Sequence, residues 1–270
     1  PAAALSMRRQ ARATLLLALA VLALGGMAWW QLRREAGGDL PRLLAGFDAA
    51  AVQSIRVRTV EGPLRRFERQ GRGWRMREPY DLPAESEAVE RLLGIASAPL
   101  RKRLEDAAPD LRKLGLAPPQ ATVDYAGAAA QHLEFGATDA IRGERYVRRG
   151  DEVWLVPDRF SAWLFAPAEN ELDRRVAAGS APVALRLDGV DRPDLLAAWQ
   201  AVAATRVLAA AEVPAPAGAM HTVELRASDG SVRALTLWRG DVGYCVRRRD
   251  LDLVYVYDES AVQALLAPAP

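Results

Sequence analysis

The residues best suited to chemistry in this 270-residue chain are two histidines and one cysteine. His132 and His221 lie in stretches where polar and apolar residues alternate, as in half-buried strands, and neither has partners at the spacing of a zinc site. Cys245 lies in a similar stretch, with no helix N-terminus beside it to lower its pKa. We therefore expect a buried, unreactive thiol and no catalytic, cofactor-binding or metal-ligating residue.

Paired carboxylates are the next candidates, because glycosidases and related enzymes use two such groups across a cleft. The pairs are Asp151-Glu152, Asp188 with Asp191, and Asp258-Glu259. All of them fall at predicted turns or helix starts, where carboxylates cap backbone N–H groups. The segment 136–143 has glycines at its ends but lacks the lysine of a phosphate-binding loop, so it reads as a hairpin connection. We expect that the protein is not an enzyme.

Arginine clusters stand out at Arg65-Arg66, Arg148-Arg149 and 247–249. Each alternates with apolar residues, which predicts charge on the solvent face of a sheet. Solvated charge and protection of sheet edges explain most such clusters. A sharper hypothesis is that Arg148 and Arg247, at equivalent places in two repeats, present a basic interaction face to anionic lipid headgroups or to an acidic partner.

The overall charge argues against nucleic-acid binding. Basic residues number 36 and acidic residues 34, so there is no strongly basic character to attract a phosphate backbone. With a single cysteine, no intramolecular disulfide can form, and the fold must be held by its core alone.

An unbroken apolar run over residues 13–30 is the clearest feature of the N-terminus. Such a helix rises about 27 Å, close to the roughly 30 Å of hydrocarbon that a spanning helix crosses. The residues expected at the membrane interface flank this run and are basic or aromatic: Arg8, Arg9, Arg12, Trp29, Trp30, Arg33 and Arg34. We expect 1–12 in the cytoplasm, a single transmembrane anchor at 13–30, a short linker at 31–50, and the bulk of the chain in the periplasm of a bacterial inner membrane.

Export signals are the alternative. A cleaved signal peptide also has a basic start and an apolar centre, and the pair Arg8-Arg9 fits a twin-arginine signal. The run is longer than a usual signal core, however, and Trp29 and Trp30 occupy the place of a small-residue cleavage site. These features favour an uncleaved anchor.

Beyond the linker, three units of alternating strands and helices are predicted. Residues 51–104 read as β-β-β-α and 110–175 as a four-stranded meander with a helix. Residues 180–270 read as a third unit, a repeat of the second, because matches such as Val123 with Val223 and Val156 with Val256 keep one offset. The first unit is interpreted as a more distant, shorter relative. The predicted fold class is α+β, with repeated antiparallel meanders that each carry a helix on one face.

Several segments together resemble a known family. They are Gly73–Met76, Asp110–Pro119, Arg145–Arg148, Val153–Val156 and Glu171–Arg175. Their order and spacing resemble the uncharacterised family catalogued as domain of unknown function 4340, over about residues 47–175. The resemblance implies an N-terminal membrane anchor and, for some relatives, association with ABC transporters of the gliding-motility type. It implies no catalytic residues.

Two functions follow as expectations. The first is a non-enzymatic, single-pass envelope protein that contacts membrane lipid through its anchor and a membrane or envelope protein through its exported domain, as an accessory subunit of an ABC-type transporter. The second is a periplasmic module that binds an envelope glycan, lipid or peptide in a groove between the repeats.

Overall fold

The computed structural model describes residues 21–22, 24–27, 40–105, 109–214, 216, 218 and 220–267. The expected cytoplasmic segment 1–12, most of the expected anchor and most of the linker lie outside these residues. Within the described part of the chain, no helix combines the length and the apolar character that crossing a membrane requires. The chain divides into two compact units, Pro1–Pro41 and Arg42–Pro270, and the second contains both β-sheets.

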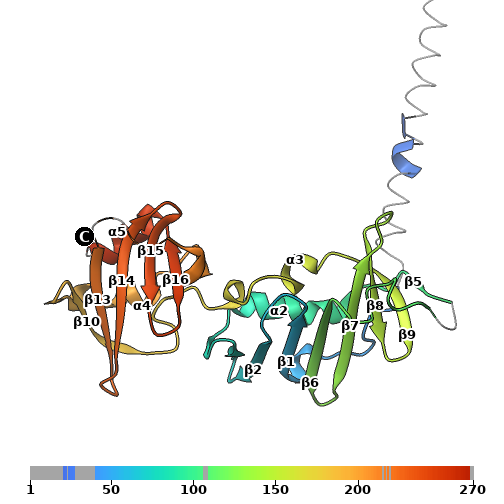
Figure 1. The fold of residues 1–270 in the computed structure, drawn as a ribbon, viewed down its shortest axis with the longest axis horizontal. Helices are drawn as coiled ribbons and strands as arrows, with labels where there is room; N and C mark the ends of the chain where they lie inside the picture. Colours follow the sequence, from blue (N-terminus) through green and yellow to red (C-terminus); the bar gives the residue numbers. More distant parts are fainter. Residues whose placement is uncertain are drawn as a thin grey trace, which may run out of the picture. The chain divides into compact units, whose positions relative to one another are not determined.

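The first sheet has nine antiparallel strands in the order β4-β3-β2-β1-β6-β7-β8-β9-β5 (Figure 1). Its strands are β1 (Val52–Thr59), β2 (Arg65–Gln70), β3 (Gly73–Glu78), β4 (Leu82–Pro83), β5 (Lys102–Arg103), β6 (Ala121–Gly127), β7 (Gln131–Thr138), β8 (Glu144–Arg149) and β9 (Glu152–Pro157). Its helices are α2 (Ser86–Gly94) and α3 (Ser161–Leu164), with short 3-10 turns η1 (Ala49–Ala51), η2 (Ile95–Ser97) and η3 (Ala168–Glu171).

The second sheet has seven antiparallel strands in the order β11-β10-β13-β14-β15-β16-β12. Its strands are β10 (Pro182–Leu187), β11 (Val190–Asp191), β12 (Arg206–Ala209), β13 (Met220–Ala227), β14 (Val232–Gly240), β15 (Gly243–Arg248) and β16 (Leu253–Tyr257). Its helices are α4 (Leu196–Ala201) and α5 (Glu259–Leu266), with 3-10 turns η4 (Pro193–Leu195) and η5 (Ala210–Glu212).

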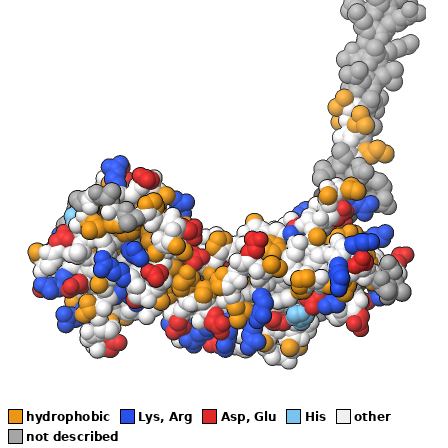
Figure 2. Space-filling view, in the orientation of Figure 1, with side chains coloured by type: hydrophobic (Ala, Val, Ile, Leu, Met, Phe, Trp, Pro, Cys, Tyr) orange, Lys and Arg blue, Asp and Glu red, His pale blue; other side chains and the backbone are white. Residues whose placement is uncertain are grey.

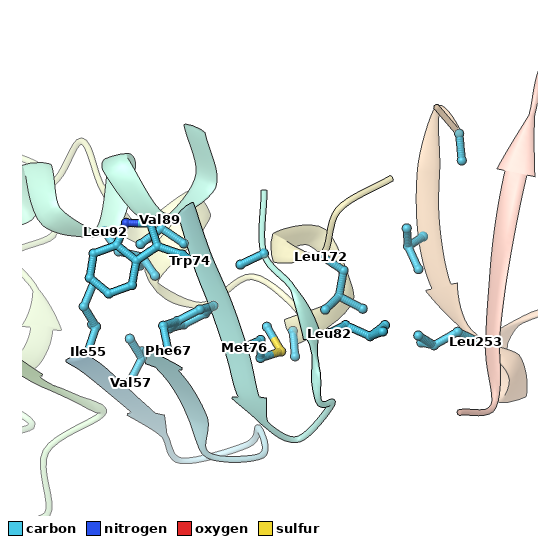
Figure 3. Packing of buried hydrophobic residues seen from close by; sticks show 14 of the residues in the cluster. Ile55, Val57, Phe67, Trp74, Met76, Leu82, Val89, Leu92, Leu172 and Leu253 are labelled. Carbon is cyan, nitrogen blue, oxygen red and sulfur yellow. The ribbon is translucent and has the colours of Figure 1, made fainter. Parts of the chain in front are cut away.

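Alternation of side chains explains how the first sheet buries one face. Ile55 and Val57 of β1 have no exposed surface, while Arg56 between them is exposed. Figure 3 shows these apolar side chains in the same cluster as Val89 and Leu92 of α2. The helix is amphipathic, and its apolar stripe packs into the core. The fold is therefore α+β, as the sequence predicts.

The two sheets share one plan. Strand order β2-β1-β6-β7-β8-β9-β5 in the first corresponds to β11-β10-β13-β14-β15-β16-β12 in the second. A bulge interrupts the β1–β6 register between Val52 and Ser54, and another interrupts the β10–β13 register between Pro182 and Ala184. We call β1 to α3 the first module and β10 to α5 the second module.

This plan differs from the expected division into three units. The unit 51–104 is not a shorter copy of the meander, because β1 pairs directly with β6 and the unit completes the sheet of 110–175. Its counterparts in the second module are β10, α4 and β12. The physical reason is that β1, paired only with β2, would leave the N–H and C=O groups of its other edge without partners, and pairing with β6 satisfies them.

One of the expected residue matches is also wrong. Val156 lies in the main core, whereas Val256 lies in a separate cluster with Trp238 and Cys245. Val147 pairs with Trp154 and its counterpart Val246 pairs with Tyr255, so the position equivalent to Val156 is the core residue Tyr257, one residue beyond Val256. A change of one residue moves a side chain to the opposite face of a sheet.

The chain must cross the sheet to pass from its edge strand β5 to its central strand β6. The connection crosses β7 at Gly136, where the Leu114 carbonyl accepts a hydrogen bond from the Ala137 N–H at 2.8 Å. A Cβ atom on Gly136 would lie 2.3 Å from that carbonyl oxygen. Gly115, with φ +67°, lets the connection turn. The segment Asp110–Pro119, which carries much of the family resemblance, is this crossing.

We expect Gly136→Ala to lower the free energy of unfolding by roughly 1–3 kcal/mol, because the connection must move to admit the methyl group. Urea unfolding of the full chain in mild detergent measures this. Gly94→Ala is the matched control, since a Cβ there meets nothing within 4 Å and alanine favours the helix. That variant should gain roughly 0.5–1 kcal/mol. Equal stability of the two variants would contradict the crossing as the reason for Gly136.

Candidate functional site

Arg65 is the most unusual side chain of the first module, since only 2% of it is exposed. Its Nη1 donates to Glu171 Oε1 at 2.5 Å, and its Nη2 donates to the Leu164 carbonyl oxygen. Nη1 also lies 3.4 Å from the Trp163 carbonyl oxygen. The expectation that the cluster Arg65-Arg66 places both charges on the solvent face is therefore wrong for Arg65. The alternation of β2 turns this residue toward the last carbonyl group of α3, that of Leu164, which needs a donor.

Glu171 balances the charge of Arg65 from the turn η3, and it is also buried. Burial raises the pKa of Glu171 to about 7, although Arg65 opposes this shift. The second carboxyl oxygen, Oε2, is buried and has no hydrogen-bond partner among the described residues. The backbone of Glu171 also accepts a hydrogen bond from the Glu85 N–H at 2.8 Å. The ion pair therefore ties β2, α3 and the start of α2 together.

The second module also has a side-chain donor for a carbonyl group near the end of its last helix, but there the donor is a tryptophan. The last turn of its last helix contains a buried leucine, Leu265, and the indole Nε1 of Trp199 donates to the Leu265 carbonyl oxygen at 2.9 Å. Trp199 is fully buried on α4. The comparison indicates that Arg65 stabilises the end of a helix and does not act as a free charge.

Beside Arg65 lies a pocket with a volume of about 590 Å³. It is formed wholly by residues of the first sheet and the segments around α3 and η3, so it is not a groove between the repeats. Its lining consists of Thr59, Val60, Glu61, Gly62, Pro63, Arg65, Gln120, Phe165, Ala166, Pro167, Ala168 and Glu169. This volume falls in the range of small-molecule and peptide pockets, roughly 300–1,000 Å³.

Apolar side chains dominate the walls and the mouth of this pocket. Val60 is 69% exposed and Phe165 is 38% exposed, which is unusual for residues of their size. The guanidinium of Arg145 lies 5.0 Å from the Phe165 ring centroid and holds it by a cation–π contact. Exposed apolar groups around a pocket are typical of a binding surface.

Two carboxylates, Glu61 and Glu169, add charge to the lining. Glu169 accepts a hydrogen bond from the hydroxyl of Tyr80, and burial raises the pKa of that phenol. The one basic residue of the lining, Arg65, is already paired with Glu171. The pocket is thus apolar with an acidic margin.

The histidines considered from sequence lie on the outside of the sheets. His132 Nδ1 lies 2.6 Å from Asp124 across neighbouring strands, and His221 Nδ1 lies 2.7 Å from Asp188. Partial burial lowers the pKa of His132, but its hydrogen bonds to carboxylates outweigh this and leave the pKa above its usual value. Both contacts hold strand ends together and neither histidine lines the 590 Å³ pocket.

The cysteine and the carboxylate pairs have structural surroundings too. Cys245 is fully buried, and burial raises the pKa of its thiol. Asp258 is the N-cap of α5 and accepts from the Ala261 N–H at 2.8 Å, and Asp188 accepts from the Thr222 N–H at 2.8 Å. Among the described residues, no group of three or more acidic, histidine or cysteine side chains could hold a metal ion.

Arg148 and Arg247 lie on equivalent strands of the two modules, β8 and β15, and each is paired with a carboxylate. Arg148 Nε lies 2.5 Å from Glu134, and Arg247 Nη2 lies 3.1 Å from Asp252. On the side of the molecule seen in Figure 2, basic and acidic side chains are interspersed. The neighbouring Arg248 is only 1% exposed and pairs with Asp250, so the cluster 247–249 is not wholly on the solvent face either. The expected interface residues of the anchor lie outside the described residues.

The pocket itself was missed from sequence, because its lining comes from three segments far apart in the chain. The available signal was a set of apolar residues that lie outside the strands and helices of the structure, namely Val60, Pro63 and Phe165-Ala166-Pro167. Large apolar residues outside strands and helices have no core to fill unless they pack onto another segment or a ligand.

One region of the chain matches the model of a known family. The family model described as Domain of unknown function (DUF4340) matches residues 74–186. This region of the chain is therefore similar to the DUF4340 family, as the sequence predicts. No curated protein and no solved structure matches the chain.

The DUF4340 match covers two of the three segments that line the pocket. Gln120 and 165–169 lie inside it, whereas 59–65 precede it. The match begins in β3 and ends in β10, the first strand of the second module. It therefore leaves out β1 and β2, although the sheet of the first module depends on the pairing of β1 with β6. The structural module and the family match therefore have different limits.

The Arg65–Glu171 pair predicts a pH dependence of stability. Because the folded state raises the pKa of Glu171 from 4.5 to about 7, folding takes up a proton between these pH values. The contribution of Glu171 to the free energy of unfolding is fully present below about pH 4.5 and is lost as the pH rises to about 7. In the wild type, we expect the titration of Glu171 to lower the free energy of unfolding by roughly 3 kcal/mol over this range. Glutamine cannot titrate, so this decrease should be absent from Glu171→Gln.

Urea unfolding of wild type and Glu171→Gln at several pH values measures this effect. The difference between the two free energies of unfolding should change between pH 4.5 and pH 7 and be constant above it. If the free energies of unfolding of the two proteins changed in parallel at every pH, Arg65 would have to keep Glu171 ionised despite its burial.

Proposed function

We propose that this chain is a non-enzymatic, single-pass inner-membrane protein whose exported domain binds another protein. Its role is that of an accessory subunit of an ABC-type transporter or a similar envelope assembly. The observation that carries the binding role is the 590 Å³ pocket with exposed Val60 and Phe165 in the folded region. The membrane location is supported by the arginine-flanked apolar run at 13–30.

Other features support the same proposal. The region that matches DUF4340 resembles a family in which some members are associated with ABC transporters of the gliding-motility type. His132, His221 and Asp258 make contacts that hold strands or a helix end, and Cys245 is buried, which favours a structural role for each. The folded unit begins at Arg42, twelve residues after the apolar run ends at Trp30. A domain on so short a linker would stay close to the membrane and to proteins embedded in it.

The pocket also favours a second candidate function. A cavity of this volume suits a small molecule as well as a protein side chain, so a periplasmic module for an envelope glycan, lipid or peptide is the alternative.

Identification of stoichiometric companions distinguishes the two functions. The full chain is crosslinked in cells, solubilised in mild detergent, purified and analysed by mass spectrometry. Recovery of a permease with an ATPase would support the accessory role. Recovery of the chain alone would contradict it and favour the ligand-binding module.

The proposed topology predicts which cysteines react in intact spheroplasts. Ile141 lies in the β7–β8 connection and is 90% exposed, while the native Cys245 is fully buried. We expect a membrane-impermeant maleimide to label Ile141→Cys without lysis, because the domain is on the outer side of the inner membrane. The wild type, with Cys245 alone, should be labelled only after denaturation. Labelling of Ile141→Cys only after lysis would place the domain in the cytoplasm.

A further inference from the structure

The charges of the 590 Å³ pocket restrict what it can bind. Arg65 is the only basic residue in its lining, and Glu171 balances that charge from beneath. Glu61 and Glu169 remain at the margin, and no ion pair involves either of them in the described structure. Arg145, which contacts the lining residues Phe165 and Gln120, is paired with Asp158 at 3.0 Å. The margin therefore carries an excess of negative charge.

An anionic ligand suits this arrangement poorly. A phosphate or carboxylate inside the pocket would face Glu61 and Glu169, and like charges held close together cost free energy. The donors of Arg65 are largely used by Glu171 and by the carbonyl groups of Trp163 and Leu164. A group that is apolar with a positive charge beside it complements both the walls and the margin.

We propose that this pocket receives an apolar side chain of the partner protein and that Glu61 and Glu169 pair with a lysine or arginine next to that side chain. The proposal rests on the proposed function, and it names the chemistry of the partner segment. Val60 and Phe165 pack against the apolar group, and Pro63 and Pro167 supply rigid walls that lose little conformational entropy on binding. The two carboxylates fix the orientation of the segment.

Site-specific photocrosslinking in cells tests this proposal on the full chain. The photoreactive amino acid p-benzoylphenylalanine replaces Phe165 and keeps an aromatic ring in the pocket. The matched control carries the same group at Ile141, which is exposed but is not part of the pocket lining. We expect an adduct at 165, absent at 141, whose crosslinked peptide contains an apolar residue within a few positions of a lysine or arginine.

The carboxylates are tested by the double substitution Glu61→Gln and Glu169→Gln in the photoreactive chain. Glutamine at 169 can still accept the hydrogen bond from Tyr80, so the fold should be kept, and an unchanged urea midpoint verifies this. Loss of two partly exposed ion pairs should reduce the yield of the adduct about fivefold or more. Asp241→Asn, an exposed acid in the β14–β15 turn, is the control and should leave the yield unchanged.

Three results would overturn the proposal. They are an adduct with lipid or no adduct at 165, a crosslinked peptide without a basic residue, and a yield that the double substitution does not change. If companions are still recovered after crosslinking in any of these cases, the accessory role stands and only the pocket assignment fails. If no companion is recovered at all, the proposed function fails as well.

Discussion

The pairing of β1 with β6 is the constraint on which the rest of the first module depends. It brings together two strands separated by the whole of β2 to β5 and α2, with Ile55 opposite Tyr125 at its centre. Because β6 starts beside β1, while the preceding strand β5 pairs at the far edge, the chain has to cross β7 to β9 on its way. The tight passage over Gly136 and the turn at Gly115 are consequences of that crossing. The second module repeats the arrangement with β10 and β13, including the bulge at the start of the pair.

Burial of a helix end creates the second requirement shared by the modules. Carbonyl groups at the C-terminus of a helix lack partners within the helix, and those of α3 and α5 lie in the core. Trp199 meets this need with a neutral indole, while Arg65 meets it with a charge that then requires Glu171. In the first module, the charged side chain of Arg65 and its partner Glu171 form an ion pair beside an apolar pocket. In the second module, the neutral side chain of Trp199 needs no such partner. The two modules thus share a fold but differ in the surroundings of this helix end.

The pocket forms because three segments that are far apart in the sequence come together in the first module. The β1–β2 connection, the residue before β6 and the segment after α3 all meet beside Arg65. The β1–β2 connection and the segment after α3 contribute exposed apolar residues, Val60 and Phe165, and the carboxylates of Glu61 and Glu169 set the charge of the margin. A binding surface of this kind can change its specificity through loop residues without altering the sheet that holds them.

Local patterns in the sequence determined much of this protein. Alternation of side chains located most of the strands, glycine and aspartate marked the turns and helix caps, and the residues of Asp110–Pro119 indicated the DUF4340 family. These features depend on neighbours within a few residues, so they can be predicted from the sequence without knowledge of the fold. The apolar run at 13–30 is likewise a property of the sequence itself.

Only the tertiary structure decided how the units combine and where the polar residues lie. Nothing local to β1 shows that it pairs with β6, because strand pairing depends on the path of the chain between them. The burial of Arg65 depends on Glu171 and on the carbonyl groups of α3, which lie about a hundred residues away in sequence. Alternation shows that a side chain faces one side of a sheet. Whether that side is covered, and by which groups, is set by distant segments, and this is why the pocket and its ion pair required the folded chain.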